Sequence, residues 1–215
     1  MAKTQQTSID WRAAKVTQRR YDRQALWYDL NDIPMELFAR ALRRQLWGKV
    51  DGGRVLEVGV GTGRNLPYHP PRSGVTAIDI SPKLLAKAAR KAHKKGRPVE
   101  LGLMDAQRLA FGDGSFDSAA ATFVFCSVPD PLAGLAEVRR VLKPGGRLLL
   151  LEHVRSKNRV LGWLMDRLNP LFVRLSGANI NRDTVGNVAG AGFEIVAVDS
   201  HMAGLVKLIE ARKGA

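Results

Sequence analysis

Three glycines stand at alternate positions directly after a run of apolar residues, in the segment Glu57-x-Gly59-x-Gly61-x-Gly63. Glycine serves where the backbone must adopt a positive φ, or where another molecule approaches the main chain more closely than a Cβ atom permits. In an open parallel sheet, ligands bind beyond the carboxyl ends of the strands, where the strand order reverses. The spacing therefore predicts a ligand-binding loop after the first strand.

Two common phosphate-binding loops do not fit this segment. A dinucleotide-binding loop needs a further glycine at position 64, where it lets the helix pack on the strand, but Arg64 stands there. A nucleoside-triphosphate loop needs Gly-Lys-Ser or Gly-Lys-Thr, and neither follows the third glycine. The remaining pattern is a glycine loop with an acidic residue two positions before its first glycine.

This pattern resembles the first motif of the class I S-adenosylmethionine-dependent methyltransferases. Four later segments are similar to the same family in the expected order, up to about residue 152: AIDIS, MDAQRLAFGDGSFD, FCSVPDP and LKPGGRLLLLE. The resemblance implies a Rossmann-like fold with a seven-stranded sheet and a methyl-transfer activity. It also implies S-adenosylmethionine as cofactor, with S-adenosylhomocysteine as product.

The resemblance further implies which residues hold the cofactor. Asp79 looks like the acid that accepts hydrogen bonds from both ribose hydroxyls, a task that suits a carboxylate because both of its oxygens are acceptors. Asp105 looks like the acid that receives the adenine amino group, and the next backbone amide, that of Ala106, meets the ring. The implied cofactor residues are Glu57, Gly59, Gly61, Gly63, Asp79, Ile80, Asp105 and Ala106. As an alternative, each acid is only a backbone, turn or helix-terminus partner.

Three residues are candidates for acceptor chemistry. Tyr21 and Tyr28, within YDRQALWYD, resemble a Tyr-Asp segment that small-molecule methyltransferases of this family fold over the cofactor; packing as core aromatics is the alternative. His153 follows the fifth expected strand at its ligand-facing end, where an imidazole deprotonates an acceptor or makes a structural hydrogen bond. Methyl transfer from a sulfonium donor requires few further catalytic side chains, because the enzyme mainly holds the acceptor in line with the methyl group and excludes water.

No metal site is expected from the sequence. The four histidines are scattered along the chain at positions 69, 93, 153 and 201. Cys126 is the only cysteine, so neither a cysteine-based zinc site nor an internal disulfide is possible. Cys126 itself fits a small buried hydrophobe better than a nucleophile.

The elements that position these residues alternate regularly from residue 54 onward, as is typical of a parallel sheet covered on both faces. Strands are expected at 54–60, 75–80, 99–105, 116–128 and 147–154, helices at 81–96, 130–146, 159–180 and 181–192, and two closing strands joined by a tight turn within 193–212. Ser81 and Asp130 are expected N-caps, and Gly96 a left-handed helix end. We predict a doubly wound α/β fold whose mostly parallel sheet has an antiparallel C-terminal strand.

The expected domain organisation is a single structural domain without linkers or repeats. Residues 1–50 are predicted to form N-terminal helices that cover the site and contact a membrane surface, and residues 51–215 to form the methyltransferase domain. No apolar run resembles a signal peptide or is long enough to cross a bilayer. We therefore expect a cytoplasmic protein that is peripheral at the inner face of the membrane.

The charge points to an acidic partner. Lys and Arg number 34 against 20 Asp and Glu, a formal charge of +14, which attracts polyanions such as nucleic acid or an anionic membrane. The N-terminal helices and the segment 159–180 interleave arginines with Leu, Phe and Trp, the composition of helices that lie in a lipid interface. The alternative is that these faces pack on the sheet while their arginines stay solvated.

The acceptor is predicted from the resemblance to two groups within the family. EVGVGTGRNLPYHP and VPDPLAGLAEVRRVLKPGG look like bacterial phospholipid N-methyltransferases, whereas LLEHVRS and DRLNPLF resemble the methyltransferase-like thiol methyltransferases of animals. The sequence departs from the first group by EHV after the fifth strand, and from the second by the expected lack of a membrane anchor. We predict phosphatidylethanolamine N-methylation towards phosphatidylcholine, with a thiol or another small hydrophobic acceptor as the alternative.

Two other classes of function remain open at this point. A nucleic-acid methyltransferase is compatible with the charge, but FCSVPDP stands where the amino-directed enzymes place an Asn/Asp-Pro-Pro-Tyr/Phe type of motif, and no RNA-binding module is recognisable. A non-catalytic protein that binds the cofactor is the second alternative. The first is not expected, and the intact motifs disfavour the second.

Overall fold

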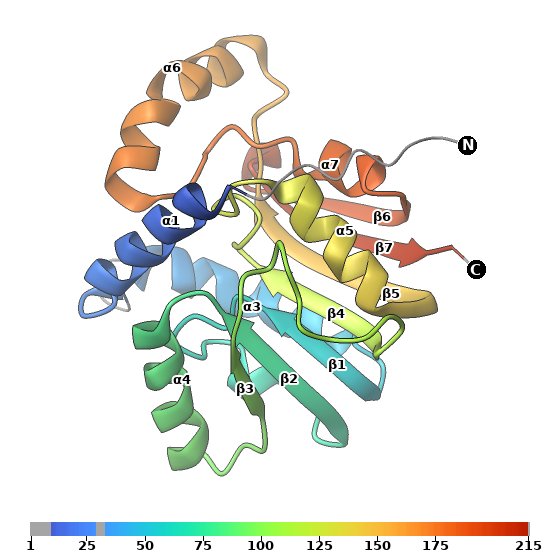
Figure 1. Cartoon of the computed structure of the whole chain (residues 1–215). Coiled ribbons are helices and arrows are strands. Elements are labelled where there is room, and N and C mark those ends of the chain that lie inside the picture. Colours follow the sequence, from blue (N-terminus) through green and yellow to red (C-terminus); the bar gives the residue numbers. More distant parts are fainter. Residues whose placement is uncertain (1–9, 29–32, 215) are drawn as a thin grey trace.

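The computed structural model describes residues 10–28 and 33–214, apart from the side chains of residues 33–35. Seven strands of this described part form one sheet in the order β3-β2-β1-β4-β5-β7-β6 (Figure 1). Their bounds are β1 Gly53–Val58, β2 Ser73–Asp79, β3 Glu100–Leu103, β4 Phe116–Thr122, β5 Leu142–His153, β6 Phe193–His201 and β7 Val206–Lys213. The pairs among β1 to β5 are parallel, and β7 runs antiparallel to both β5 and β6. The predicted mostly parallel sheet with an antiparallel C-terminal strand is confirmed.

Helices cover both faces of the sheet. Their bounds are α1 Trp11–Gln24, α3 Ile33–Gly48, α4 Pro82–Lys94, α5 Pro131–Val141, α6 Arg159–Ser176 and α7 Thr184–Gly190. The α3 and α4 helices pack on one face, and α5 and α7 pack on the other (Figure 1). The α1 and α6 helices lie next to each other, where the Gln24 side-chain amide donates to the Leu175 carbonyl at 3.0 Å.

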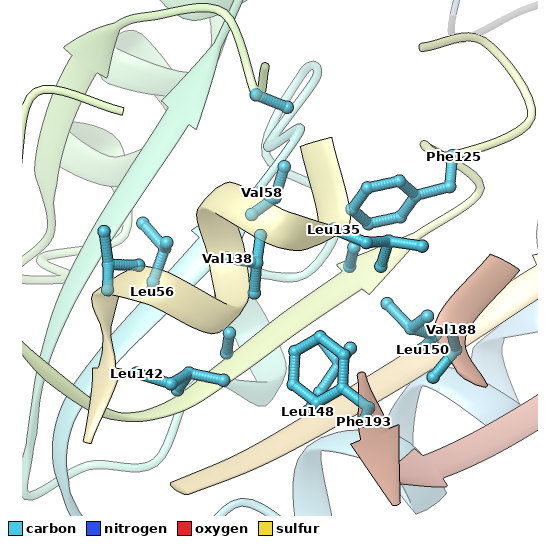
Figure 2. Packing of buried hydrophobic residues seen from close by; sticks show 14 of the residues in the cluster. Leu56, Val58, Phe125, Leu135, Val138, Leu142, Leu148, Leu150, Val188 and Phe193 are labelled. Carbon is cyan, nitrogen blue, oxygen red and sulfur yellow. The ribbon is translucent and has the colours of Figure 1, made fainter. Parts of the chain in front are cut away.

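Four consecutive leucines in β5 show how one strand serves two cores. Leu148 and Leu150 pack with residues of α5 and α7 (Figure 2), whereas Leu149 and Leu151 pack with Trp47 and its neighbours on the α3 side. Successive side chains of a strand point to opposite faces, so an unbroken apolar run is what a strand covered on both faces requires. The run therefore marks β5 as a central strand.

The two predicted N-caps and the predicted left-handed residue after α4 are confirmed. The Ser81 hydroxyl accepts a hydrogen bond from the Leu84 amide at 3.2 Å at the start of α4, and the Asp130 carboxylate accepts one from Ala133 at 3.0 Å at the start of α5. Gly96, just beyond α4, has a φ of +59°, a left-handed conformation that glycine adopts without steric cost.

Several predicted boundaries are wrong or imprecise. The helix expected at 159–180 ends at Ser176, and the helix expected at 181–192 spans only Thr184–Gly190. The β4 strand ends at Thr122 rather than at residue 128, because Phe123 has a φ of +58° that turns the chain out of the sheet. The α5 helix ends at Val141 rather than near residue 146, and β5 already begins at the extended Leu142. Pro144 disfavours helical backbone at the preceding residue and lacks an amide donor, so the helix cannot continue. A short 3₁₀ helix, Met202–Gly204, makes the turn between β6 and β7.

Candidate active site

A cavity of about 640 Å³, counting the open space at its mouth, lies at the carboxyl ends of β1, β2 and β4. The predicted site residues that line its wall are Tyr21, Tyr28, Gly59, Gly61, Asp79, Ile80, Asp105 and Ala106. Three others, Glu57, Gly63 and His153, do not belong to this wall.

The glycine loop needs its glycines for different reasons. All three have positive φ angles, +71° at Gly59, +55° at Gly61 and +78° at Gly63. A Cβ atom at Gly59 would collide with the Val124 side chain, and one at Gly63 would lie 2.6 Å from Leu66 Cδ1. A Cβ atom at Gly61 would meet nothing within 4 Å. The first and third glycines therefore allow close packing, and the second leaves open space in the wall of the cavity.

Asp79, at the end of β2, is held by two backbone amides. Its Oδ2 accepts a hydrogen bond from Gly61 N and its Oδ1 one from Ser81 N, both at 2.8 Å. Burial raises the pKa of the carboxyl group to about 6, although the two amide bonds lower it. Each carboxylate oxygen can accept more than one hydrogen bond, so the group keeps acceptor capacity for a ligand in the cavity.

Asp105, after β3, is fixed by the side chain two positions further on. Its Oδ1 accepts from the Gln107 amide at 2.9 Å, and both carboxylate oxygens lie 3.0–3.1 Å from Gln107 Nε2. Gln107 Oε1 in turn accepts from the Asp130 amide at 3.1 Å, at the N-cap of α5. The loop that contains Ala106 is therefore tied to the start of α5. Sequence reasoning did not identify Gln107.

The described residues also set limits on other site chemistry. No group of three His, Cys, Asp or Glu side chains among them is arranged to hold a metal ion. No helix within the described ranges combines the length and hydropathy needed to cross a bilayer.

Comparison with known proteins identifies the family. A family model described as a methyltransferase domain matches residues 56–150, from β1 into β5. The thiol S-methyltransferase TMT1B of Homo sapiens is 42% identical over 171 residues, which cover 73% of this chain and 69% of that protein. The chain belongs to the class I S-adenosylmethionine-dependent methyltransferases. S-adenosylmethionine is therefore the cofactor of this methyltransferase.

A second relative and a solved structure are also similar to this chain. The methyltransferase is 40% identical over 139 residues to a phosphatidylethanolamine N-methyltransferase of Cereibacter sphaeroides, and the match covers 63% of this chain and 66% of that protein. This chain therefore spans slightly less than two thirds of the length of that relative. A solved structure from Thermotoga maritima, described as a possible histamine N-methyltransferase, superposes with a TM-score of 0.68 at 24% identity, covering 91% of this chain and 99% of the other. At that identity the likeness shows the fold alone.

The chemical groups that line the cavity of the methyltransferase fit this cofactor. Asp79 would hold the ribose hydroxyls, because its carboxylate has spare acceptor capacity beside the open space at Gly61. The side chains of Ile80 and Ala106 give the neighbouring wall the apolar surface that a purine ring needs. Asp105 lines the same wall with its carboxylate already oriented by Gln107.

The α1 helix closes one side of the cavity through Tyr21. The Tyr21 hydroxyl lies 2.5 Å from the Ser127 hydroxyl, and burial raises the pKa of the phenol well above its usual value. Both residues line the cavity, as does Thr17 one turn earlier in α1. Sequence reasoning did not identify Ser127 or Thr17, because 106 residues separate Ser127 from its tyrosine partner.

Tyr28 forms a second aromatic wall. Its ring centroid lies 6.2 Å from that of Tyr21 with the planes tilted by 60°, and the Arg64 guanidinium lies 5.8 Å from the Tyr28 ring. The two rings therefore stand at an angle to each other at the wall of the cavity, next to the residue that follows the glycine loop. The predicted pair is brought to the site, with Ser127 as an additional partner.

Glu57 lies behind the glycine loop rather than on the cavity wall. Its neighbours in β1, Leu56 and Val58, point to the α5 side, so alternation turns Glu57 towards α3. There its fully buried carboxylate accepts from Asn65 Nδ2 at 2.6 Å and lies 2.7 Å from His69 Nε2. Glu57 thus holds the segment that follows the glycine loop from behind and does not line the cavity, and its predicted cofactor contact stays a prediction.

Glu152, at the end of β5, organises the loop that follows β4. Its Oε1 accepts hydrogen bonds from the amides of Val124 at 2.8 Å and Phe125 at 3.0 Å, just after the left-handed Phe123. Burial raises the pKa of Glu152 to about 7. This loop carries Val124 and Ser127 into the cavity wall. The sequence signal for this role is a glutamate directly after the apolar run LLLL.

His153 is not among the described residues that line the cavity. It is the last residue of β5, where it pairs with Val206 of β7, and burial lowers the pKa of its imidazole. Alternation along β5 separates it from Glu152, whose side chain reaches the loop after β4. The position of His153 at the strand end agrees with the sequence analysis, but its side chain does not line the cavity, and its role as a base stays a prediction.

Proposed function

We propose that this methyltransferase transfers methyl groups to the amine of phosphatidylethanolamine at an anionic membrane surface, towards phosphatidylcholine. The observation that carries the proposal is a row of exposed apolar side chains on α6, flanked by arginines and adjacent to α1 at the cavity. The described part of residues 1–50 would serve as the cover of the site and as part of its membrane contact.

The α6 apolar face is a continuous stripe in contact with solvent. Its members lie one, three or four positions apart: Val160, Leu161, Leu164, Leu168, Leu171, Phe172 and Leu175. The exposed fraction reaches 76% at Val160 and 69% at Leu175. Soluble proteins rarely expose a contiguous apolar stripe of this kind unless it meets a lipid surface or a partner.

Cations and a tryptophan border this face. Arg159, Arg167 and Arg174 are exposed on α6, and the Arg167 guanidinium lies 5.9 Å from the ring centroid of Trp163. Arginine beside an exposed indole is suited to the headgroup region, where phosphates are anionic and the ring is amphipathic. The charge pattern therefore supports an anionic lipid surface as the partner.

The N-terminal helices add further exposed apolar residues. Trp11 and Val16 are exposed on α1, Leu26 and Trp27 after it, and Phe38 on α3. The α1 helix also lines the cavity and contacts the end of α6. A lipid headgroup would enter the cavity beside these helices while its acyl chains stay in the bilayer.

The chemistry of the cavity supports an amine acceptor. Among the described residues of its wall, the only ionisable groups besides the tyrosines are Asp79 and Asp105, the two predicted cofactor acids. Burial disfavours charge, so it lowers the pKa of an amine and yields the neutral nucleophile, whereas it raises the pKa of a thiol and removes the thiolate. Cys126 shows this effect within the protein, because burial raises the pKa of its thiol to about 12.

The aromatic wall fits the products of amine methylation. Each transfer leaves a more highly methylated ammonium, and such groups bind to faces of aromatic rings. Tyr21 and Tyr28 provide two inclined rings at the wall. S-adenosylmethionine supplies the electrophilic methyl group, and the chain's own residues position the amine, exclude water and stabilise the cationic product.

A thiol acceptor is the second candidate. It is favoured by the similarity to human TMT1B over 73% of this chain and by the apolar character of the cavity wall. A thiol requires a base or a cation at the wall to form the thiolate, and the described wall residues include no His, Lys or Arg. We therefore rank the amine above the thiol as the methyl acceptor.

The deciding experiment supplies S-adenosylmethionine with a labelled methyl group to anionic vesicles that contain phosphatidylethanolamine, with and without a small alkyl thiol. Matched vesicles without phosphatidylethanolamine are the control. We expect label in the lipid amine, reduced by high salt, because salt screens attraction to the anionic surface. Label only in the thiol contradicts the amine proposal. Equal methyl transfer to phosphatidylethanolamine in zwitterionic vesicles, which contain no anionic lipid, contradicts the anionic surface.

A further inference from the structure

A second hollow of the methyltransferase lies on the far side of the glycine loop from Gly59. It is a groove of about 840 Å³, counting its open mouth, formed by α3, the segment 63–68 and the C-terminal part of α4. Four cationic side chains line it: Arg40, Arg64, Lys91 and Lys95. Glu36 is the one carboxylate among the described lining residues.

The single carboxylate does not neutralise the groove. Glu36 Oε2 already accepts from Arg64 Nη1 at 2.9 Å and from Arg43 Nε at 3.2 Å. Within the described residues, Arg40 and Lys95 have no carboxylate partner and both are exposed. Within the part of the chain that the structure describes, the positive charges of Arg40 and Lys95 are therefore uncompensated, and they attract an anion with several acceptor oxygens.

Apolar residues define what kind of anion the groove fits. Leu37 lines it with 64% of its surface exposed, and Pro67 and Tyr68 form another part of its wall. Phe38 is exposed beside Leu37 on α3. A nucleic acid would leave these side chains in water, whereas a lipid would cover them with its glycerol and acyl parts.

We propose that this groove binds the phosphodiester headgroup of an anionic phospholipid, with the phosphate between Arg40 and Lys95 and the acyl region along Leu37. The site is separate from the cofactor cavity and needs no methyl acceptor. It would fix one lipid molecule, whereas the α6 apolar face rests on the bilayer as a whole.

The test measures binding of monomeric dihexanoyl phosphatidylglycerol by titration calorimetry. Parallel titrations use dihexanoyl phosphatidylcholine, inorganic phosphate and a short single-stranded oligonucleotide. The groove variant is Arg40→Gln with Lys95→Gln. Its matched control, Arg44→Gln with Lys94→Gln, removes the same charge from exposed positions of the same two helices outside the groove.

We expect saturable binding of phosphatidylglycerol, weakened at least about tenfold in the groove variant and less than about twofold in the control. Bound phosphatidylglycerol should also protect Lys95, but not Lys94, from acylation by an amine reagent. Equal losses in both variants, or equal binding of phosphatidylcholine, would overturn the proposal. Inorganic phosphate binding as tightly as the lipid would assign the groove to free phosphate, and tighter binding of the oligonucleotide would assign it to nucleic acid.

Discussion

The carboxylate of Asp22 in α1 accepts a hydrogen bond from the Ser81 hydroxyl at 2.6 Å, although 59 residues separate them. Ser81 also donates its backbone amide to Asp79, the predicted ribose acceptor, at 2.8 Å. One serine therefore connects the helix that closes the cavity to the acid at the end of β2. The position of α1 and the orientation of Asp79 are coupled through this residue.

The buried carboxyl group of Asp79 makes cofactor affinity dependent on pH. Only the ionised form accepts from both ribose hydroxyls, and burial raises the pKa of the Asp79 carboxyl from its usual value of 3.8 to about 6. Affinity should therefore rise as the pH increases through about 6, and Asp79→Asn should weaken it about 10- to 100-fold at pH 8. Calorimetric titrations with S-adenosylmethionine from pH 5 to pH 8 measure both effects.

The raised pKa of Asp79 has the opposite effect on the stability of the fold: stability falls as the pH rises. A carboxyl whose folded pKa is raised contributes stability that is fully present below the unfolded value of 3.8 and is lost as the pH rises through about 6. Asp79→Asn should therefore lack this pH-dependent loss of stability, while its Nδ2 group loses one of the two backbone hydrogen bonds that the carboxylate accepts. Glu152 titrates near pH 7 in both proteins, so the difference between them isolates Asp79. An affinity that stays independent of pH in the parent protein would exclude Asp79 as the ribose acceptor.

Gly61→Leu should abolish cofactor binding and leave the sheet folded. The side chain would project from a backbone with a φ of +55° into space where no atom lies within 4 Å, at the cavity wall. Gly145→Leu is the matched control, because Gly145 also has a positive φ, +72°, and open space, but lies outside the cavity. Both variants should lose about 1–2 kcal/mol of stability, and only the first should fail to bind. Normal binding by Gly61→Leu would refute the loop assignment.

The α6 apolar face should contribute to vesicle binding. Leu164→Gln combined with Leu171→Gln removes two exposed leucines from it, and we expect vesicle affinity to fall about tenfold or more, since burying a leucine contributes about 1.5–3 kcal/mol. The control Ile195→Gln with Val196→Gln removes two exposed apolar residues from β6. Flotation with anionic vesicles measures the effect. Equal losses in both variants would show that α6 has no special contact with the bilayer.

Tyr28→Leu should weaken binding of phosphocholine more than binding of phosphoethanolamine. A cation–π contact contributes about 0.5–2 kcal/mol, and the quaternary ammonium depends on it most, because it donates no hydrogen bonds. Tyr28→Phe retains the ring and should change neither affinity more than about twofold. Competition against lipid methylation measures both ligands. Equal losses of affinity for the two headgroups would show that the aromatic wall is not part of the acceptor site.

His153→Gln should leave methyl transfer within about twofold of the parent protein, because the side chain does not line the cavity and a general base contributes about 10²–10⁴-fold. The pH profile of the rate distinguishes the two roles. A profile that loses a step near the histidine pKa in this variant would restore His153 as the base, as the sequence had indicated.

Local rules predicted much of the site. The alternation of apolar runs with capped helices specified the sheet and placed Gly59, Gly61 and Asp79 at the ends of adjacent strands, because parallel strands end at one edge. The caps at Ser81 and Asp130 were predictable from residue type alone. These features depend on neighbours within a few residues.

The tertiary structure decided which side chains reach the cavity. Alternation turned Glu57 behind the loop, and the left-handed Phe123 ended β4 early, so that Glu152 could cap the loop carrying Ser127. Tyr21 found its partner 106 residues away. The sequence by itself determined the family fold and the chemical types at the strand ends. Only packing between distant segments decided their directions, because a side chain's partners depend on which elements meet across the sheet, and local periodicity does not encode that.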